Sequence, residues 1–174
     1  MSRPVTTPRS FRLAAALLAL ALGSTGAACK KSDSADRALL GLRPVLASKP
    51  PPCATKAPKK GQLVLPKSSD GKVAECLELD KPIVDAKDVR SATVAETPAG
   101  EPALSVVLGA VGSGNLDGYA QRHQGQRLGI VTRGRLVSAP VLQFTSFAGR
   151  IQVTGLSKPE TDDLFQRLNK LIKG

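Results

Sequence analysis

The sequence is poor in aromatic, histidine and methionine residues. Its 174 residues include no tryptophan, one tyrosine, four phenylalanines, one histidine and one methionine. Proteins that hold single-stranded nucleic acid use exposed aromatic rings on which the bases stack, and so few rings offer no such platform. The single histidine, His123, and three cysteines without paired spacing also argue against a zinc site. We therefore expect no nucleic-acid partner, no metal and no cofactor.

Motifs of catalysis are equally scarce. No Cys-x-x-Cys pair exists, and the glycine-rich residues 109–118 lack both the G-x-G-x-x-G spacing and the GK[ST] of a phosphate loop. Asp162 and Asp163 fall in the first turn of a predicted helix, where they favour the helix dipole. Paired carboxylates for acid–base catalysis would need burial, which that position does not suggest. The sequence predicts a protein that is not an enzyme.

No apolar run is long enough for a permanent membrane span. Residues 13–22, "LAAALLALAL", would span about 15 Å as a helix, roughly half of a bilayer core. Arg3, Arg9 and Arg12 precede this run, and the small residues "GSTGAAC" follow it. This is the order of regions in a secretory signal. We predict that residues 1–28 are a signal peptide and that the mature protein is exported.

Two cleavage sites compete at the end of this segment. The residues "GAAC" resemble a bacterial lipobox, in which the cysteine, here Cys29, is lipidated and becomes the first residue. Gly26 occupies the position where that pattern prefers Leu or Val. The alternative is ordinary cleavage after Ala27 or Ala28, which leaves Cys29 as a plain thiol. We favour lipidation, because an unpaired cysteine directly after a signal is otherwise unusual. The expected location is the extracytoplasmic face of the cell membrane, through a lipid anchor.

Basic residues outnumber acidic ones. The sequence holds 25 Lys and Arg against 14 Asp and Glu, and removal of residues 1–28 leaves 22 against 14, a net charge of +8. Several of these lysines lie in the predicted tether and linker, at positions 30, 31, 49, 56, 59 and 60. A lysine close to anionic lipid contributes about 1 kcal/mol to membrane association. The charge thus predicts a solvated basic surface near the membrane.

The two remaining cysteines are predicted to pair. If Cys29 is lipidated, Cys53 and Cys76 are left together in an oxidising compartment, where disulfides persist. Closing the loop of about 24 residues would stabilise the fold by roughly 3 kcal/mol in the chain-entropy model.

The composition changes near residue 77. Residues 29–76 begin with the polar "KKSDSAD" and include the basic, proline-rich "KPPPCATKAPKK", which can form neither a helix nor a central strand. We predict a tether and linker there, with an apolar stretch at 37–47 that packs on a neighbour and a short strand at 62–65. Residues 77–174 are predicted to form the compact domain.

Within that domain the pattern predicts an α+β fold. Strands are expected near 91–96, 103–108, 128–132, 135–138 and 150–154, and one weak helix carries Leu116, Tyr119, Ala120 and His123 on one face. The last helix begins with a capping box of Ser157 and Glu160 and presents an apolar stripe. The expected order is β-β-α-β-β-β-α, with two helices on one face of a mostly antiparallel sheet.

The residues 128–143, "LGIVTRGRLVSAPVLQ", resemble the segment "lAIVldGkvvSAPvI" in the head subdomain of the first periplasmic domain of SecD and SecDF. The resemblance extends through "LDKPIVDAKDVRSATV", "ALSVVLGAVGSGNLDGYA" and "GRIQVTGLSKPETDDLFQRL", and so covers about residues 77–172. The triplet Ser138-Ala139-Pro140 is specific in combination with Gly134 and Gly155. Residues before the domain, "LGLRPVLA" and the cysteine-bearing linker, are similar to the segment that precedes the head in actinobacterial SecD.

The resemblance implies a free-standing, lipoprotein-like head module that binds exported polypeptide or a partner in the Sec machinery. It implies structural turn roles for Gly134, Pro140 and Gly155, with a type I turn and bulge centred on Thr132 and Arg133. This chain has Arg133 where the family usually has Asp, so its hairpin is basic. We expect Arg127, Arg133 and Arg135 to contact a partner. The alternative function is an envelope lipoprotein that uses the same fold for an unrelated ligand.

Overall fold

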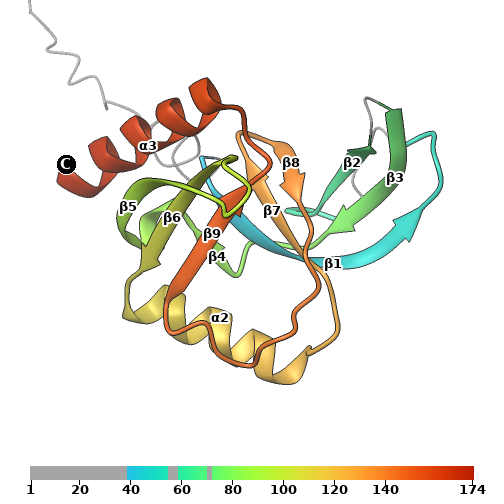
Figure 1. Ribbon diagram of the computed structural model, residues 1–174. Coiled ribbons are helices and arrows are strands. Elements are labelled where there is room, and N and C mark those ends of the chain that lie inside the picture. The colour runs from blue at the N-terminus through green and yellow to red at the C-terminus, as the bar shows by residue number, and fades with distance from the viewer. Residues whose placement is uncertain (1–38, 55–58, 70–71) are drawn as a thin grey trace, which may run out of the picture.

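The computed structural model describes residues 39–54, 59–69 and 72–174. Two sheets and two α-helices make up this part of the chain (Figure 1). The elements in chain order are β1 (Gly41–Lys49), β2 (Leu63–Ser69), β3 (Lys72–Leu79), β4 (Val84–Asp85), the short 3-10 helix η1 (Ala86–Asp88), β5 (Val89–Glu96), β6 (Pro102–Leu108), α2 (Ala110–Arg122), β7 (Leu128–Thr132), β8 (Arg135–Ser138), β9 (Arg150–Thr154) and α3 (Lys158–Lys173). From β5 onward this is the predicted order β-β-α-β-β-β-α, and the predicted α+β class is confirmed.

The strands form two antiparallel sheets, where the sequence had suggested one. The larger has the order β2-β3-β1-β7-β8, with β4 paired to β1, and the smaller has the order β5-β6-β9. In the smaller sheet Leu104, Val106 and Val153 are buried on one face, whereas on the opposite face Ser105, Val107 and Gln152 are more exposed and Ala103 is the buried exception. This alternation is what a sheet with one solvated face requires.

β1 is one of the strands that the sequence did not assign, together with β3 and β4. Its first half pairs with β7 and β4, and its second half pairs with β3 across a register shift between Val45 and Ala47. Figure 1 shows β1 running from the centre of the molecule out to the β2–β3 hairpin. The prediction of a tether and linker over 29–76 is therefore corrected for the described residues, because β1, β2 and most of β3 lie there. Prolines 50–52 end β1 but do not interrupt it.

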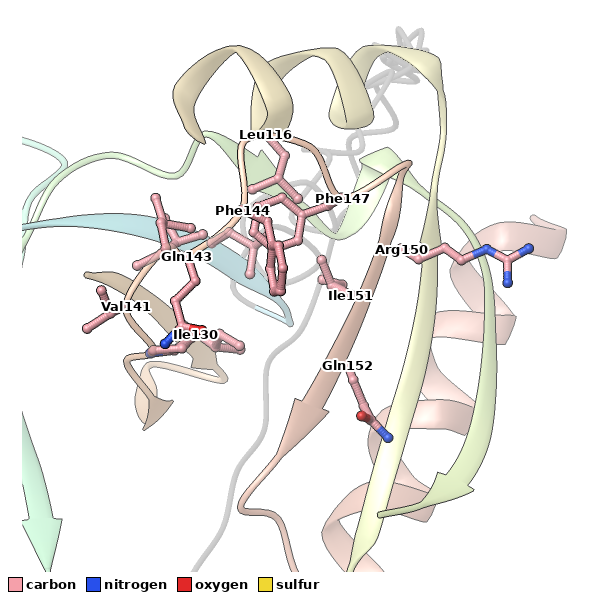
Figure 2. Close-up of a pocket in the computed structure, with 13 residues that line it drawn as sticks. Leu116, Ile130, Val141, Gln143, Phe144, Phe147, Arg150, Ile151 and Gln152 are labelled. Carbon is pink, nitrogen blue, oxygen red and sulfur yellow. The ribbon is translucent and has the colours of Figure 1, made fainter. Parts of the chain in front are cut away.

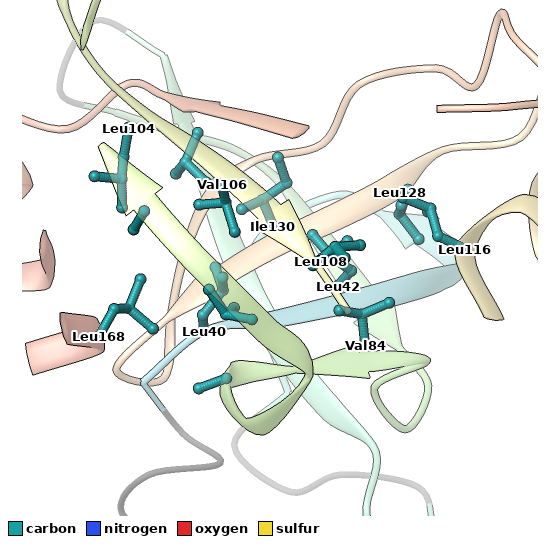
Figure 3. Packing of buried hydrophobic residues seen from close by; sticks show 14 of the residues in the cluster. Leu40, Leu42, Val84, Leu104, Val106, Leu108, Leu116, Leu128, Ile130 and Leu168 are labelled. Atoms are coloured by element: carbon teal, nitrogen blue, oxygen red, sulfur yellow. The ribbon is translucent and has the colours of Figure 1, made fainter. Parts of the chain in front are cut away.

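One apolar core joins both sheets and both helices. Figure 3 shows β6, β1 and β7 meeting in it, with Leu116 of α2 at one end and Leu168 of α3 at the other. A second, smaller cluster lies on the other side of β7 and holds Leu77, Leu79, Val131 and Leu136. Because consecutive residues of a strand point to opposite faces, β7 contributes Ile130 to the main core and Val131 to the smaller one.

The glycine-rich residues before Leu116 belong to α2, not to a loop. The helix begins at Ala110, earlier than the sequence predicted, because Gly112 can lie directly against the chain at Asp88. A Cβ at Gly112 would be only 2.7 Å from the Asp88 Cβ. The glycine thus permits a close approach that a larger residue would prevent.

The turn between β7 and β8 differs in type from the prediction. Thr132 pairs directly with Arg135, so the loop has two residues, and both Arg133 (φ +49°) and Gly134 (φ +75°) have positive φ. That combination belongs to the type I′ turn, whose twist matches the strands it joins. The register shift lies further along, between Ile130 and Val131, and so the bulge is separate from the turn.

Candidate binding groove

An apolar groove of about 430 Å³ opens between the segment after β8 and the start of β9. Leu116, Leu128 and Ile130 contribute to its floor from the main core, and Figure 2 shows Phe144 and Phe147 beside Ile151. The full lining is Leu42, Leu116, Leu128, Ile130, Pro140, Val141, Leu142, Gln143, Phe144, Phe147, Arg150, Ile151 and Gln152. Among the described residues of this lining only Arg150 is charged, so the groove suits an apolar occupant.

Backbone pairing holds one wall of the groove. The Leu128 N–H donates to the Pro140 carbonyl at 2.9 Å, and the Leu142 N–H donates to the Gln126 carbonyl at 2.8 Å. Pro140 lies just past the end of β8, where it lacks the N–H that would continue a ladder. Its carbonyl instead joins the wall to β7; the structural turn role expected of Pro140 stays a prediction.

A single carboxylate holds the loop that leads to β9. Asp117 of α2 accepts hydrogen bonds from the Phe147 N–H at 2.8 Å and from the Ser146 hydroxyl at 3.2 Å. Immediately afterwards Ala148 adopts a positive φ of 49°, which is unusual for a residue with a Cβ. Asp117 therefore helps to fix the position of Phe147 inside the groove.

Two large apolar side chains of this segment face solvent. Phe144 is 66% exposed and Val141 is 49% exposed. Neither gains from burial in this structure, although burial of such a side chain is worth about 1.5–3 kcal/mol. An occupant of the groove would cover them.

Arg127 lies close to the groove and is held by Glu75 of β3. Its two terminal nitrogens donate to the two Glu75 oxygens at 2.9 Å each, and its Nε donates to the Ala139 carbonyl at 3.3 Å. Ser48 and Lys67 also donate to Glu75. Arg127, with Ser48 and Lys67, holds the pKa of Glu75 well below its usual range. About a quarter of the Arg127 side chain is exposed. Its Nε and both terminal nitrogens are hydrogen-bonded within the protein, to Ala139 and Glu75.

Arg133 and Arg135 extend from the turn to the first half of α3. Arg133 is paired with Asp163, and Arg135 donates to Glu160 at 2.6 Å. Both pairs are about half exposed. The sequence predicted these arginines as partner contacts, and that role stays a prediction. The structure places Arg133 and Arg135 together against α3, whereas Arg127 lies apart from them against β3.

Gly155, the last of the predicted turn residues, follows β9 with φ +82°. A Cβ there would lie 3.4 Å from the Val137 carbonyl oxygen. The ends of β8 and β9 therefore converge at Gly155, and the groove opens where the two chains separate towards Pro140 and Arg150.

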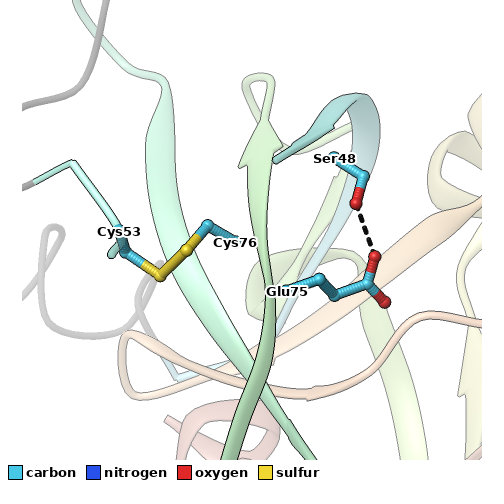
Figure 4. Close-up of a disulfide and its surroundings, with 4 residues drawn as sticks. All are labelled: Ser48, Cys53, Glu75 and Cys76. Carbon is cyan, nitrogen blue, oxygen red and sulfur yellow. Dashed lines mark hydrogen bonds between the residues drawn. A yellow bond between two sulfur atoms is a disulfide. The ribbon is translucent and has the colours of Figure 1, made fainter. Parts of the chain in front are cut away.

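Cys53 and Cys76 form the predicted disulfide, with their Cα atoms 5.3 Å apart. Figure 4 shows the bond beside Glu75, which accepts a hydrogen bond from Ser48. The bridge fastens the residues after β1 to β3 next to the carboxylate that holds Arg127. Cys29 lies outside the described residues.

His123 packs against the preceding turn of α2. Its ring stacks on Tyr119 with centroids 4.0 Å apart, and its Nδ1 lies 2.9 Å from the Tyr119 carbonyl oxygen. Within the described ranges, no group of three His, Cys, Asp or Glu residues is placed to hold a metal ion. No described helix has both the length and the apolar character needed to cross a bilayer.

The groove was not predicted from the sequence. Its signal was the apolar content of residues 140–147, "PVLQFTSF", in a segment that otherwise has the composition of a loop. Two phenylalanines in a chain with only four would have been a reason to examine that loop.

Comparisons with known proteins give a consistent result. Residues 62–170 match the family model described as SecDF, P1 head subdomain. A solved structure of SecDF, described as a membrane component that enhances protein export, superimposes with a TM-score of 0.54 at 19% identity, over 80% of this chain and 64% of that one. SecDF in a super-membrane-facing form gives the same TM-score and identity, over 80% of this chain and 19% of that one. The chain thus spans less than two thirds of each. No curated protein matches it.

Proposed function

Because this chain belongs to the SecDF P1 head subdomain family, we propose that it is a non-catalytic extracytoplasmic module that binds extended polypeptide during protein export. The observation that carries this proposal is the apolar groove between the segment after β8 and β9. It combines an apolar floor with two exposed apolar side chains, Val141 and Phe144. A folded protein buries most of its large apolar side chains, whereas an unfolded chain in transit exposes them.

The family relationship supports the link to export. The SecDF structure that shares this fold is described as a membrane component that enhances protein export. The disulfide supports a location outside the cytoplasm, since such bonds persist in oxidising compartments. A partner in the Sec machinery would be compatible with the same location, with Arg133 and Arg135 at a contact separate from the groove.

The proposal includes a lipid anchor at Cys29. The apolar run at 13–22 followed by "GAAC" supports it. A Cys29→Ser variant should leave the membrane fraction and lose the acyl mass of the mature protein. Wild-type mature protein that begins at residue 28 or 29 without added lipid mass would show that ordinary cleavage occurs instead.

The test of polypeptide binding compares two exposed apolar residues. Phe144 lies at the groove, whereas Val111, 70% exposed, lies at the start of α2 and does not line it. We expect Phe144→Asp to weaken the binding of a fluorescein-labelled unfolded polypeptide by about tenfold, because one large apolar contact is lost. Val111→Asp should leave binding unchanged, and neither change should lower the melting temperature much.

Two results would contradict this function. One is equal binding by wild type, Phe144→Asp and Val111→Asp. The other is the absence of binding to unfolded polypeptide by the wild-type protein, which would favour an envelope protein with an unrelated ligand. A photoreactive residue at position 144, activated in cells, then identifies what occupies the groove.

A further inference from the structure

β9 is an edge strand whose unpaired side lies along the groove. Among the described residues it pairs with β6 only, in a register that sets Val107 opposite Arg150 and Val106 opposite Ile151. In antiparallel strands, opposite residues alternate between pairs that exchange hydrogen bonds with the neighbour and pairs that point their N–H and C=O groups away from it. The register therefore decides which backbone groups of β9 face the groove.

Two hydrogen bonds fix this alternation. Leu108 and Gly149 are the next opposite residues after Val107 and Arg150. The Leu108 N–H donates to the Gly149 carbonyl at 2.8 Å, so these two form a hydrogen-bonded pair. The Arg150 N–H donates in the other direction, to the Phe147 carbonyl at 2.9 Å. It follows that Ile151 directs its backbone groups to β6, whereas Arg150 and Gln152 direct theirs to the groove.

Three backbone groups are left for an occupant: the Arg150 carbonyl, the Gln152 N–H and the Gln152 carbonyl. In the part of the chain that the structure describes, none of them has a backbone partner outside the sheet. Past Gln152 the edge is closed by β8, which approaches at Gly155. The open edge is thus short and coincides with the apolar groove.

Side chains alternate along the same edge. Figure 2 shows Ile151 directed towards Phe147, while Arg150 and Gln152 point away to the outer face of the sheet. Arg150 is exposed and, among the described residues, forms neither an ion pair nor a side-chain hydrogen bond. A strand added here would place alternate side chains in the groove and the others beside a cation that has no counter-charge.

We propose that the groove binds polypeptide by strand addition to Arg150–Gln152 and selects an apolar–acidic–apolar pattern. The two apolar side chains enter the groove beside Ile151, Phe144 and Phe147, and the acidic side chain lies on the outer face next to Arg150. This inference rests on the proposed function and specifies the substrate class of that site. Strand addition gives affinity through main-chain hydrogen bonds and specificity through alternate side chains.

The experiment uses the wild-type chain and fluorescein-labelled peptides. The reference peptide, Ser-Thr-Val-Glu-Leu-Thr-Ser, is compared with the same composition in the order Ser-Thr-Val-Leu-Glu-Thr-Ser. The reordered peptide should bind about tenfold more weakly, because only one of its apolar side chains can enter the groove. N-methylation of Glu or of Leu in the reference peptide tests the backbone bonds. Adjacent N–H groups of a strand point to opposite sides, so the two methylated peptides should differ in affinity by about tenfold.

The charge is tested separately. Replacing the central Glu of the peptide with Lys should weaken binding by about threefold, the size of one cross-strand charge pair. The Arg150→Glu protein should instead bind the Lys peptide more tightly than the Glu peptide. Because Arg150 is exposed, this variant should keep the wild-type melting temperature. Equal affinities of the two N-methylated peptides, or of the two residue orders, would overturn strand addition even if all of them bind. Failure of every peptide and of unfolded polypeptide to bind would instead remove the proposed function itself.

Discussion

Glu75 and Arg127 lie 52 residues apart in the sequence and meet through two hydrogen bonds of 2.9 Å. Glu75 lies in β3 next to the disulfide-bonded Cys76. Arg127 precedes β7 and donates to the Ala139 carbonyl beside the groove. The pair therefore joins the β2–β3 hairpin to the groove wall. A two-point pair between a guanidinium and a carboxylate is among the stronger polar contacts in proteins.

Glu75→Gln should lower the free energy of unfolding by about 1–2 kcal/mol, because Gln retains the shape but loses the charge-assisted bonds. Glu78→Gln is the matched control on the same strand. Glu78 pairs with Lys49, whose side chain is 62% exposed, so its loss should cost less than about 1 kcal/mol. Urea unfolding of the two variants checks the difference. Equal losses would show that the Arg127 contact is no stronger than a surface pair.

Stability should depend on pH through Glu75. Since Arg127, Ser48 and Lys67 lower its pKa in the folded state, the unfolded state, where Glu titrates near about 4.3, binds the proton first. The stabilisation is complete above that value and is lost as the pH falls towards the folded-state pKa. The melting temperature of wild type should thus fall more steeply below about pH 4.5 than that of Glu75→Gln. Parallel melting curves from pH 5 to pH 2.5 would contradict this.

Charge reversal at the turn should destabilise the fold only slightly. Arg135→Glu faces Glu160, and both side chains are about half exposed, so we expect a loss of about 0–1 kcal/mol. Adding Glu160→Gln should restore part of that loss, because Gln removes the repulsion between two acidic side chains and still accepts from the Ser157 N–H in the capping box. Thermal melting of the two single variants and the double variant measures the coupling. A large loss that the second change fails to recover would mean that Arg135 is structural in another way.

Gly134→Val should cost about 1–2 kcal/mol. A Cβ at Gly134 meets no atom within 4 Å, so the penalty arises from the positive φ of 75° and not from a clash. Gly134→Asn is the control, since Asn tolerates this conformation better. Chemical unfolding should rank wild type above Asn and Asn above Val. A silent Val variant would show that the turn can adopt another type.

Removing the disulfide should destabilise the domain by roughly 3 kcal/mol, as expected for its loop length. The double variant Cys53→Ala with Cys76→Ala should melt at a similar temperature to the reduced wild-type protein. Non-reducing peptide mapping of exported material, alkylated during purification, provides the direct check. Recovery of both residues as free thiols would show that the bond does not form in the cell.

The sequence determined those features that depend on neighbouring residues. Ser157 and Glu160 form the capping box, in which Glu160 accepts from the Ser157 N–H at 2.8 Å, and Leu164 and Leu168 are buried as their spacing predicted. The order of elements after β5 also followed from the period of the apolar residues and from glycine positions. Local patterns suffice here, because each element's apolar face is encoded within its own few turns or residues.

Tertiary structure alone decided the rest. β1 has proline and glycine within it, and it becomes a strand because β3, β4 and β7 supply its hydrogen-bond partners. Arg127 and Glu75 carry no signal of each other in the sequence, and the groove exists only where two edges from separate sheets diverge. Contacts between distant segments depend on register and on the angle between sheets. Neither quantity is encoded in a local pattern, and therefore the candidate site, unlike most of the fold, had to be read from the structure.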